Sequence, residues 1–244
     1  ANDAEGQVWY NSTSGTFKTL VGGFSWSSGG NMSTARRTVA GAGSQTLGLA
    51  FGGYIGPAIS AATEEYNGSA WTAGGNLNQS RYWLAGTGAQ TSALAFGGMF
   101  PVGTKVTSTE LYDGATWTTG GALGTARYIL SGGGIQSAAF AFGGSTPTPG
   151  PTSITEEYNG SSWTAGGNYP ISVAGAGGTG TQTAGLGCGG STPSSPTLSN
   201  ITAEYDGSSW AASNPLNEGK AYGGTSGSQT SAIYFGGATP VSIT

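Results

Sequence analysis

The sequence Glu110-Leu111-Tyr112-Asp113-Gly114-Ala115-Thr116-Trp117 recurs in close variants along the chain. A tyrosine, an Asn-Gly or Asp-Gly pair and a tryptophan follow the same pattern at residues 64–71, 156–163 and 203–210. A glycine pair recurs with the same period, at residues 52–53, 97–98, 143–144, 189–190 and 236–237. Five tryptophans are spaced by 45, 46, 46 and 47 residues: Trp26, Trp71, Trp117, Trp163 and Trp210. A period near 46 residues indicates a chain built from one repeated supersecondary unit.

Each repeat predicts four short antiparallel strands. In the unit 81–121 we expect strands at residues 81–86, 92–96, 106–112 and 116–118, with a proline-containing loop after the glycine pair. Asp113-Gly114 predicts a tight hairpin of type I′, which needs positive φ at both central residues. No segment has the apolar periodicity of a helix. Four strands in about 46 residues are typical of one blade of a β-propeller.

The two ends of the chain predict how such a ring closes. Residues 16–27 have the pattern of a third and a fourth strand, whereas residues 220–237 have that of a first and a second strand. Together they complete one blade, and a sheet shared by both ends removes exposed edges. We therefore expect an all-β, five-bladed propeller of four-stranded antiparallel blades over residues 16–244. We expect residues 1–15 to form an N-terminal extension or hairpin segment.

The repeat resembles a kelch repeat. The resemblance rests on the glycine pair after the second strand, on the tyrosine five residues before the tryptophan, and on the basic residue that follows it, here Arg127 before Phe142-Gly143-Gly144. It covers about residues 16–244 and implies a propeller. Kelch propellers usually have six or seven blades, whereas this chain has five repeats. Because kelch domains include binding modules and a few enzymes, the resemblance does not transfer a function.

A second resemblance lies near the N-terminus. Residues 5–18, with the sequence EGQVWYNSTSGTFK, are similar to a short hairpin segment of bacteriophage structural and tail-fibre proteins. The Gly/Ser/Thr-rich repeats that follow look like those of marine phage proteins. This resemblance implies a virion component with a receptor-binding role, located on the virion or outside the cell.

The composition excludes several classes of function. Only 7% of the 244 residues are charged, Lys and Arg total seven, and the net charge is −4, so no basic surface for nucleic acid or anionic lipid is expected. No apolar run approaches the roughly 20 residues of a membrane span. The chain has no histidine and one cysteine, Cys188, which replaces a phenylalanine of the other repeats and is expected to be a small buried hydrophobe.

Catalysis also has little support in the sequence. Without histidine, a Ser/His or Cys/His nucleophilic site is excluded, and transition metals lack their usual ligands. Most acidic residues follow the repeat, as do Glu64, Glu110 and Glu156, and the off-repeat Glu218 has no acidic partner. The paired carboxylates of a glycosidase are therefore not evident. We expect a protein without enzyme activity, metal or cofactor.

Two sets of repeated polar residues have alternative interpretations. Basic residues occupy one repeat position, ten after the tryptophan, in four of the five repeats, at Arg36, Arg81, Arg127 and Lys220. They either brace the scaffold with the repeated glutamates and carbonyls or surround the channel mouth and meet an anionic ligand. A glutamine followed by Thr or Ser recurs at the turn after the first strand, at residues 45, 90, 136, 182 and 229. These pairs either satisfy backbone groups or form five equivalent sugar sites.

The candidate ligand-binding residues lie where the repeats differ. The loops after each glycine pair vary most and emerge, in a four-stranded blade, on the same face as the connections between blades. Trp83 departs from the tryptophan period and is the best candidate for a stacking surface, the alternative being a strand aromatic packed between blades. The predicted site residues are Trp83, Tyr82, Arg81, Asn76, Asn78, Tyr54, Phe100 and Tyr169.

The sequence thus favours a non-catalytic recognition module, a glycan-binding adhesin of a phage tail fibre or virion whose partner is a host-surface glycan. The alternative is a structural virion or fibre subunit that packs against other virion proteins. A neutral, polar surface with few charges suits both functions.

Overall fold

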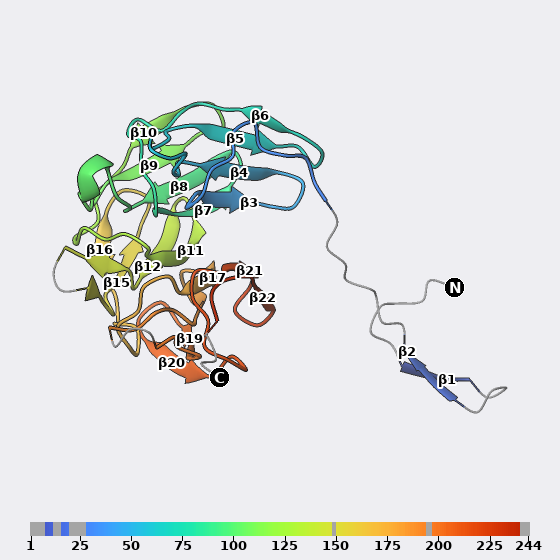
Figure 1. Ribbon diagram of the computed structural model, residues 1–244. Helices are drawn as coiled ribbons and strands as arrows, with labels where there is room; N and C mark the ends of the chain where they lie inside the picture. Colours follow the sequence, from blue (N-terminus) through green and yellow to red (C-terminus); the bar gives the residue numbers. More distant parts are fainter. Residues whose placement is uncertain (1–7, 12–15, 20–27, 148–149, 194–196, 240–244) are drawn as a thin grey trace, which may run out of the picture. The chain divides into compact units, whose positions relative to one another are not determined.

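The structure is a computed structural model that describes residues 8–11, 16–19, 28–147, 150–193 and 197–239 (Figure 1). The chain divides into two compact units, Ala1–Gly30 and Asn31–Thr244. In the first unit, β1 (Val8–Asn11) and β2 (Thr16–Thr19) form an antiparallel hairpin in which Trp9 lies opposite Lys18. Residues 20–27, which include the predicted fourth strand with Trp26, lie outside the described residues.

The second unit consists of repeated antiparallel sheets. Four of them have four strands, and the last has two among the described residues. The described residues contain no α-helix, only one 3-10 turn at Pro101–Gly103. A small extra hairpin, β13 (Ser145–Thr146) and β14 (Gly150–Pro151), lies in the loop after Gly144. The strands of the sheets are β3 (Ala40–Gly43), β4 (Gly48–Phe51), β5 (Thr63–Tyr66) and β6 (Trp71–Ala73); β7 (Ala85–Ala89), β8 (Ser92–Phe96), β9 (Thr109–Tyr112) and β10 (Trp117–Thr119); β11 (Ser131–Ile135), β12 (Ala138–Phe142), β15 (Thr155–Tyr158) and β16 (Trp163–Ala165); β17 (Gly177–Thr181), β18 (Ala184–Cys188), β19 (Thr202–Tyr205) and β20 (Trp210–Ser213); and β21 (Gly224–Gly227) with β22 (Ala232–Phe235).

The first strands of successive sheets lie next to one another. In Figure 1 the sheets follow one another along a curve, with β3, β7, β11, β17 and β21 on its inner side. Hydroxyl groups join these strands: Thr87 Oγ1 donates to the Gly134 carbonyl at 2.6 Å, and Thr179 Oγ1 to the Gly227 carbonyl at 2.6 Å. Glycine is required here by close approach, since a Cβ on Gly86 would lie 2.4 Å from the Phe51 ring of the preceding sheet.

The first strand of each repeat begins later than predicted. We expected it at 81–86, but β7 spans Ala85–Ala89, whereas the second strand matches the prediction at Ser92–Phe96. Residues 81–84 cannot extend the strand, because Trp83 has a φ of +53° and Arg81 turns its side chain into the sheet. Only the segment after Trp83 has the extended backbone that pairs with β8.

The predicted hairpins form, but with a different turn. Asp113 to Thr116 make a four-residue connection between β9 and β10, in which Tyr112 lies opposite Trp117. Only the glycine has positive φ, at +94°, so the turn is not of type I′. The Asp113 carboxylate accepts hydrogen bonds from the Ala115 and Thr116 amides at 2.8 and 2.7 Å. An Asx-type side-chain bond therefore replaces the second positive-φ residue.

The repeated tryptophans pack between neighbouring sheets. Trp117 lies against Phe51 of the preceding sheet, with ring centroids 4.9 Å apart, and its Nε1 donates to Thr63 Oγ1 at 2.9 Å. The same pair of contacts recurs for Trp163 and for Trp210. Cys188 occupies the phenylalanine position as expected and is buried, which raises the pKa of its thiol to about 11. The core is thus a series of aromatic layers between sheets.

The repeated arginines brace the sheets from within. Arg81 is fully buried; its Nη2 donates to Glu110 Oε1 at 2.8 Å and its Nη1 to the carbonyls of Gly97 and Ser108, both at 2.8 Å. Arg36 with Glu64 and Arg127 with Glu156 repeat this arrangement. The interpretation of these residues as a scaffold brace is confirmed. Lys220 instead pairs with Glu218 at 2.6 Å at the surface.

The repeated glutamines join neighbouring sheets. Gln90 Nε2 donates to the carbonyls of Gly48 and Tyr66 in the preceding sheet, at 2.9 and 2.7 Å. The glutamines at 136, 182 and 229 make the equivalent pair of bonds. They therefore satisfy backbone groups, as one interpretation predicted, but those of the adjacent sheet rather than of their own turn.

Candidate functional site

The loops that differ between repeats share one face of the second unit. After the glycine pair, Met99 exchanges two backbone hydrogen bonds with Tyr82, which precedes β7: the Tyr82 amide donates at 3.2 Å and the Met99 amide at 2.9 Å. Equivalent bridges join Arg37 with Tyr54 and Tyr128 with Ser145. We call this side, formed by the segments before each first strand and the loops after each glycine pair, the loop face. The opposite side, with the glutamine turns and the Asn-Gly and Asp-Gly turns, is the turn face.

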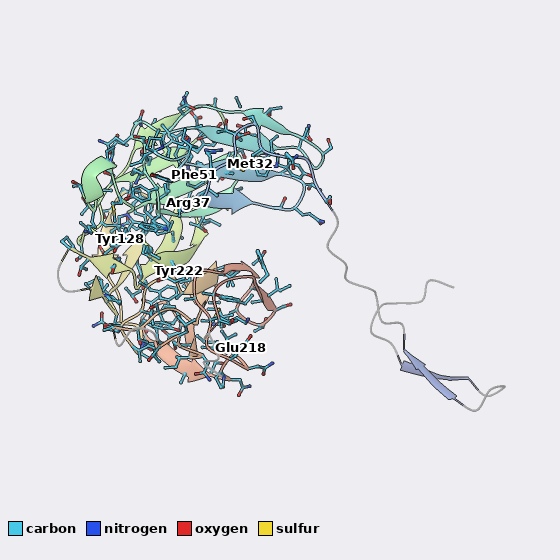
Figure 2. The ribbon with its side chains drawn as sticks, viewed as in Figure 1. Met32, Arg37, Phe51, Tyr128, Glu218 and Tyr222 are labelled. Carbon is cyan, nitrogen blue, oxygen red and sulfur yellow. The ribbon has the colours of Figure 1, made fainter. Side chains whose placement is uncertain are left out.

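A row of aromatic rings lies on the loop face. The ring centroids of Tyr54 and Tyr82 are 5.8 Å apart, those of Tyr82 and Trp83 5.1 Å, and those of Trp83 and Tyr128 5.6 Å. A cation covers each end: the Arg37 guanidinium lies 4.8 Å from the Tyr54 ring and Lys105 Nζ 5.4 Å from the Tyr128 ring. Figure 2 labels Arg37 and Tyr128, which come from the loops before β3 and β11. Three repeats therefore contribute to this aromatic row.

A cavity of about 350 Å³ opens beside the row. Arg37, Thr38, Tyr54, Tyr82 and Trp83 line it. Its volume lies within the roughly 300–1,000 Å³ typical of small-molecule sites. Both Tyr82 and Trp83 are only partly buried, so their rings offer surface to a ligand. The cavity combines flat apolar surfaces with one guanidinium and several hydroxyl groups, a lining that suits a polar ligand with an apolar face.

The structure brings some of the predicted site residues together and separates others. Tyr54, Tyr82 and Trp83 line the cavity. Asn76 is exposed and Phe100 is partly exposed, but neither lines the cavity. Asn78, in the connection between β6 and β7, binds the second sheet: its backbone amide donates to Glu110 Oε2 at 2.7 Å and its side-chain amide to the Trp117 carbonyl at 3.0 Å.

Two of the predicted residues are inaccessible. Arg81 is fully buried in its ion pair with Glu110. Tyr169 is 2% exposed and packs against Phe142 and Trp210, with centroids 4.8 and 4.9 Å away. Burial raises the pKa of the Tyr169 hydroxyl, which keeps it neutral. Both side chains stabilise the core and offer no surface to a ligand.

Sequence reasoning missed Arg37, Tyr128 and Lys105. Arg37 and Tyr128 each follow the repeated arginine directly, as Tyr82 does, so the repeat position itself was the available signal. Lys105 lies in the loop after Gly97-Gly98, where only the fold brings it over the next repeat. No spacing in the sequence indicates that contact.

The carboxylates of the described sheets have structural partners. Glu64, Glu110 and Glu156 pair with arginines, and Glu65 accepts a hydrogen bond from the Tyr112 hydroxyl at 2.5 Å. Glu157 accepts one from Tyr205. In the part of the chain that the structure describes, no three His, Cys, Asp or Glu side chains are grouped as metal ligands. Nor do the described residues include a helix with the length and apolar character of a membrane span.

The sequence matches no protein family model and no curated protein.

Proposed function

We propose that this protein is a non-catalytic recognition module that binds surface glycan through the loop face. The observation that carries the proposal is the aromatic row with its 350 Å³ cavity. A pyranose ring has C–H groups on its flat faces and hydroxyl groups around its rim, so it suits tyrosine and tryptophan rings that carry polar atoms at their edges. Because the row belongs to loops held by a rigid set of sheets, it is ordered before a ligand arrives.

We further propose that the fold is a kelch-like, five-bladed propeller closed by residues 16–27. One buried polar atom supports closure. Thr63, Thr109 and Thr155 each accept a hydrogen bond from the indole of the next repeat, whereas the equivalent Thr202 Oγ1 is buried without a partner among the described residues. The next tryptophan around the ring is Trp26, eight residues after Lys18, just as Trp210 lies eight after Thr202. A strand pair containing Trp26 supplies the missing donor.

Closure has a consequence for the N-terminal hairpin. By the repeat spacing, residues 18–21 form the third strand of the fifth blade and have strands on both sides. Lys18 and Thr19 are paired with β1 in the hairpin of the first unit. Once Lys18 and Thr19 have a strand of the blade on each side, they cannot also pair with β1. Closure therefore requires that the pairing of β1 with β2 be broken.

The biological setting that we propose is a phage tail fibre or another virion component, with host-surface glycan as the partner. The support is the resemblance of residues 5–18 to phage structural proteins together with the sparsely charged, Gly/Ser/Thr-rich composition. The described hairpin of β1 and β2 is consistent with that resemblance.

A structural subunit is the second candidate function. Two large apolar side chains on the turn face favour it: Leu47 is 55% exposed and Ile135 58% exposed. Exposed apolar side chains on one face suit packing against another virion protein.

A glycan array separates the two functions. The purified chain is applied with two variants: Trp83→Gly, which removes a ring from the aromatic row, and Leu47→Ala, which removes an exposed apolar group from the turn face. Glycan recognition predicts saturable binding that Trp83→Gly weakens about tenfold or more and that Leu47→Ala leaves unchanged. Absence of binding to every glycan, with the fold intact by circular dichroism, contradicts the recognition function and favours the structural subunit.

A further inference from the structure

Five equivalent residues on the loop face share an unusual backbone conformation. Each lies two positions after the site of the repeated arginine and has a φ in the left-handed region. The residues and their φ angles are Thr38 (+56°), Trp83 (+53°), Ile129 (+54°), Gly175 (+66°) and Tyr222 (+62°). Positive φ is an outlier for β-branched and bulky residues, and glycine adopts it without strain.

The main chain at these positions is held without help from the side chains. From the second repeat onward, the amide of this residue donates to the carbonyl of its equivalent in the preceding repeat: Trp83 to Thr38 at 3.2 Å, Ile129 to Trp83 at 2.9 Å, Gly175 to Ile129 at 2.9 Å and Tyr222 to Gly175 at 2.8 Å. Gly175 demonstrates that the position is built equally well with no side chain. The fold therefore does not require Thr, Trp, Ile or Tyr here, although four repeats keep a strained residue.

These five residues surround one cavity. A space of about 430 Å³ is lined by all of them together with the apolar side chains of Val39, Leu84, Leu130 and Ala176. No charged residue lines it. Beyond it, the first strands enclose a second space of about 240 Å³ lined by glycine backbone and by small residues such as Thr87, Thr179 and Thr225. We call the 430 Å³ space the mouth and the 240 Å³ space the channel. The mouth is lined by apolar and aromatic side chains, whereas the channel is lined by backbone polar groups and hydroxyls.

We infer that this mouth is a second sugar subsite, continuous with the aromatic row through Trp83, and that it takes an uncharged sugar unit. Trp83 lines both the mouth and the 350 Å³ cavity, so a chain of at least two sugar units extends from Tyr54 across Trp83 into the mouth. The C–H face of the unit in the mouth lies on Trp83, Ile129 and Tyr222, and its hydroxyls point to the polar channel. Since no cation lines the mouth, a uronic or sialic acid there loses hydration without gaining a counter-charge.

The strain supports a binding role for these side chains. Non-glycine residues in sparsely populated backbone regions persist at functional sites, where the side chain serves a purpose other than stability. The five positions vary between repeats although the neighbouring Arg, Gln and Gly-Gly positions recur. One variable side chain per repeat, projected around a common mouth, is a means of setting specificity on a fixed scaffold.

The inference rests on the proposed function, and one experiment separates the two. Tyr222→Gly and Ile129→Gly change the mouth and leave the 350 Å³ cavity as it is, whereas Tyr54→Ala changes that cavity and leaves the mouth as it is. Binding of each variant is measured on an array of neutral oligosaccharides and their uronic acid- or sialic acid-ended counterparts, with thermal unfolding in parallel. Both glycine variants are expected to unfold at or above the wild-type temperature because they relieve strain.

We expect the two mouth variants to weaken binding of oligosaccharides with neutral ends by about three- to tenfold, while their stability is kept. Wild-type levels of binding in both mouth variants, with Tyr54→Ala weakened, overturn the second subsite and leave the proposed function in place. Exclusive binding of acid-ended glycans also overturns it. Failure of the wild type to bind any glycan overturns the proposed function and this inference together.

Discussion

At the scale of single residues, the buried guanidiniums are the most demanding groups in the protein. Arg81 and Arg127 are fully buried, and burial lowers the pKa of each guanidinium, although the partner carboxylates Glu110 and Glu156 oppose that shift. Each arginine remains charged because its intrinsic pKa is far above neutrality. A buried charge of this kind is tolerated when most of its donors are paired: Nη1 and Nη2 of Arg127 bind two carbonyls and the Glu156 carboxylate, whereas its Nε is buried without a partner among the described residues.

Breaking one of these pairs is therefore costly. Arg81→Met leaves the Glu110 carboxylate buried without its counter-charge, and we expect a loss of about 3–5 kcal/mol in the free energy of unfolding. Urea denaturation followed by tryptophan fluorescence measures it. The matched control is the double variant Arg81→Met with Glu110→Leu, which removes both charges and is expected to recover a large part of the loss. A single variant as stable as the wild type contradicts the brace.

The sequence predicted these braces because arginine and glutamate recur at fixed distances from the tryptophan. It did not predict the strained conformation of Trp83 or Ile129, since a tryptophan or isoleucine carries no signal for positive φ. The aromatic row was only partly foreseen for a related reason. Its members come from three repeats, and the contacts of Tyr54 with Tyr82 and of Trp83 with Tyr128 form only through the packing of sheets.

At the scale of the elements, each sheet is joined to the next by the same few contacts. The indole of Trp163 donates to Thr109 Oγ1 across the boundary at 2.9 Å, and Gln136 donates to two carbonyls of the preceding sheet. The repeat made these sheets predictable, together with the second strand at Ser92–Phe96. It did not predict the start of the first strand, because Tyr82 and Trp83 have a higher strand propensity than the Ala- and Gly-rich segment 85–89 that forms β7.

Thr202 tests whether a fifth boundary of this kind exists. Thr109→Val removes the acceptor of a buried indole and is expected to cost about 1–2 kcal/mol in the free energy of unfolding. If Trp26 completes the fifth blade, Thr202→Val costs a similar amount, and a double-mutant cycle with Trp26→Phe shows coupling between the two sites. A Thr202→Val variant that is as stable as the wild type, or more stable, contradicts closure, because an unpaired buried hydroxyl is then replaced by a methyl group without loss.

At the scale of the whole molecule, buried phenols and the thiol determine the response to alkaline pH. Burial and the hydrogen bond to Glu65 raise the pKa of Tyr112 to about 12, from an ordinary value of 10.0, and burial raises that of Cys188 to about 11, from 9.0. A raised pKa in the folded state means that the unfolded chain loses its protons first as pH rises. The shifted pKa values therefore make their full contribution to the free energy of unfolding below about pH 9. This contribution is lost as pH rises between about 9 and 12.

The measurement is the melting temperature between pH 6 and 12. We expect it to fall from about pH 9 upward, and Tyr112→Phe to have a shallower fall than the wild type because it lacks the titrating phenol. A wild-type melting temperature that does not change up to pH 12 contradicts the assignment of these buried protonated groups.

The proposed closure of a ring concerns the whole chain, and deletion tests it. β21 and β22 form a two-stranded sheet among the described residues, where every earlier repeat has four strands. If residues 16–27 complete that sheet, deletion of residues 220–244 removes the platform on which they pair and exposes the packing surface around Cys188. We expect this deletion to lower the free energy of unfolding by about 3 kcal/mol, which corresponds to a fall of about 6–12 °C in melting temperature for a chain of this size.

Deletion of residues 1–15, outside the predicted blade, serves as the control and is expected to leave the melting temperature unchanged. An unchanged melting temperature after loss of 220–244 is incompatible with a closed ring, since the ends of the chain then contribute nothing to holding it together.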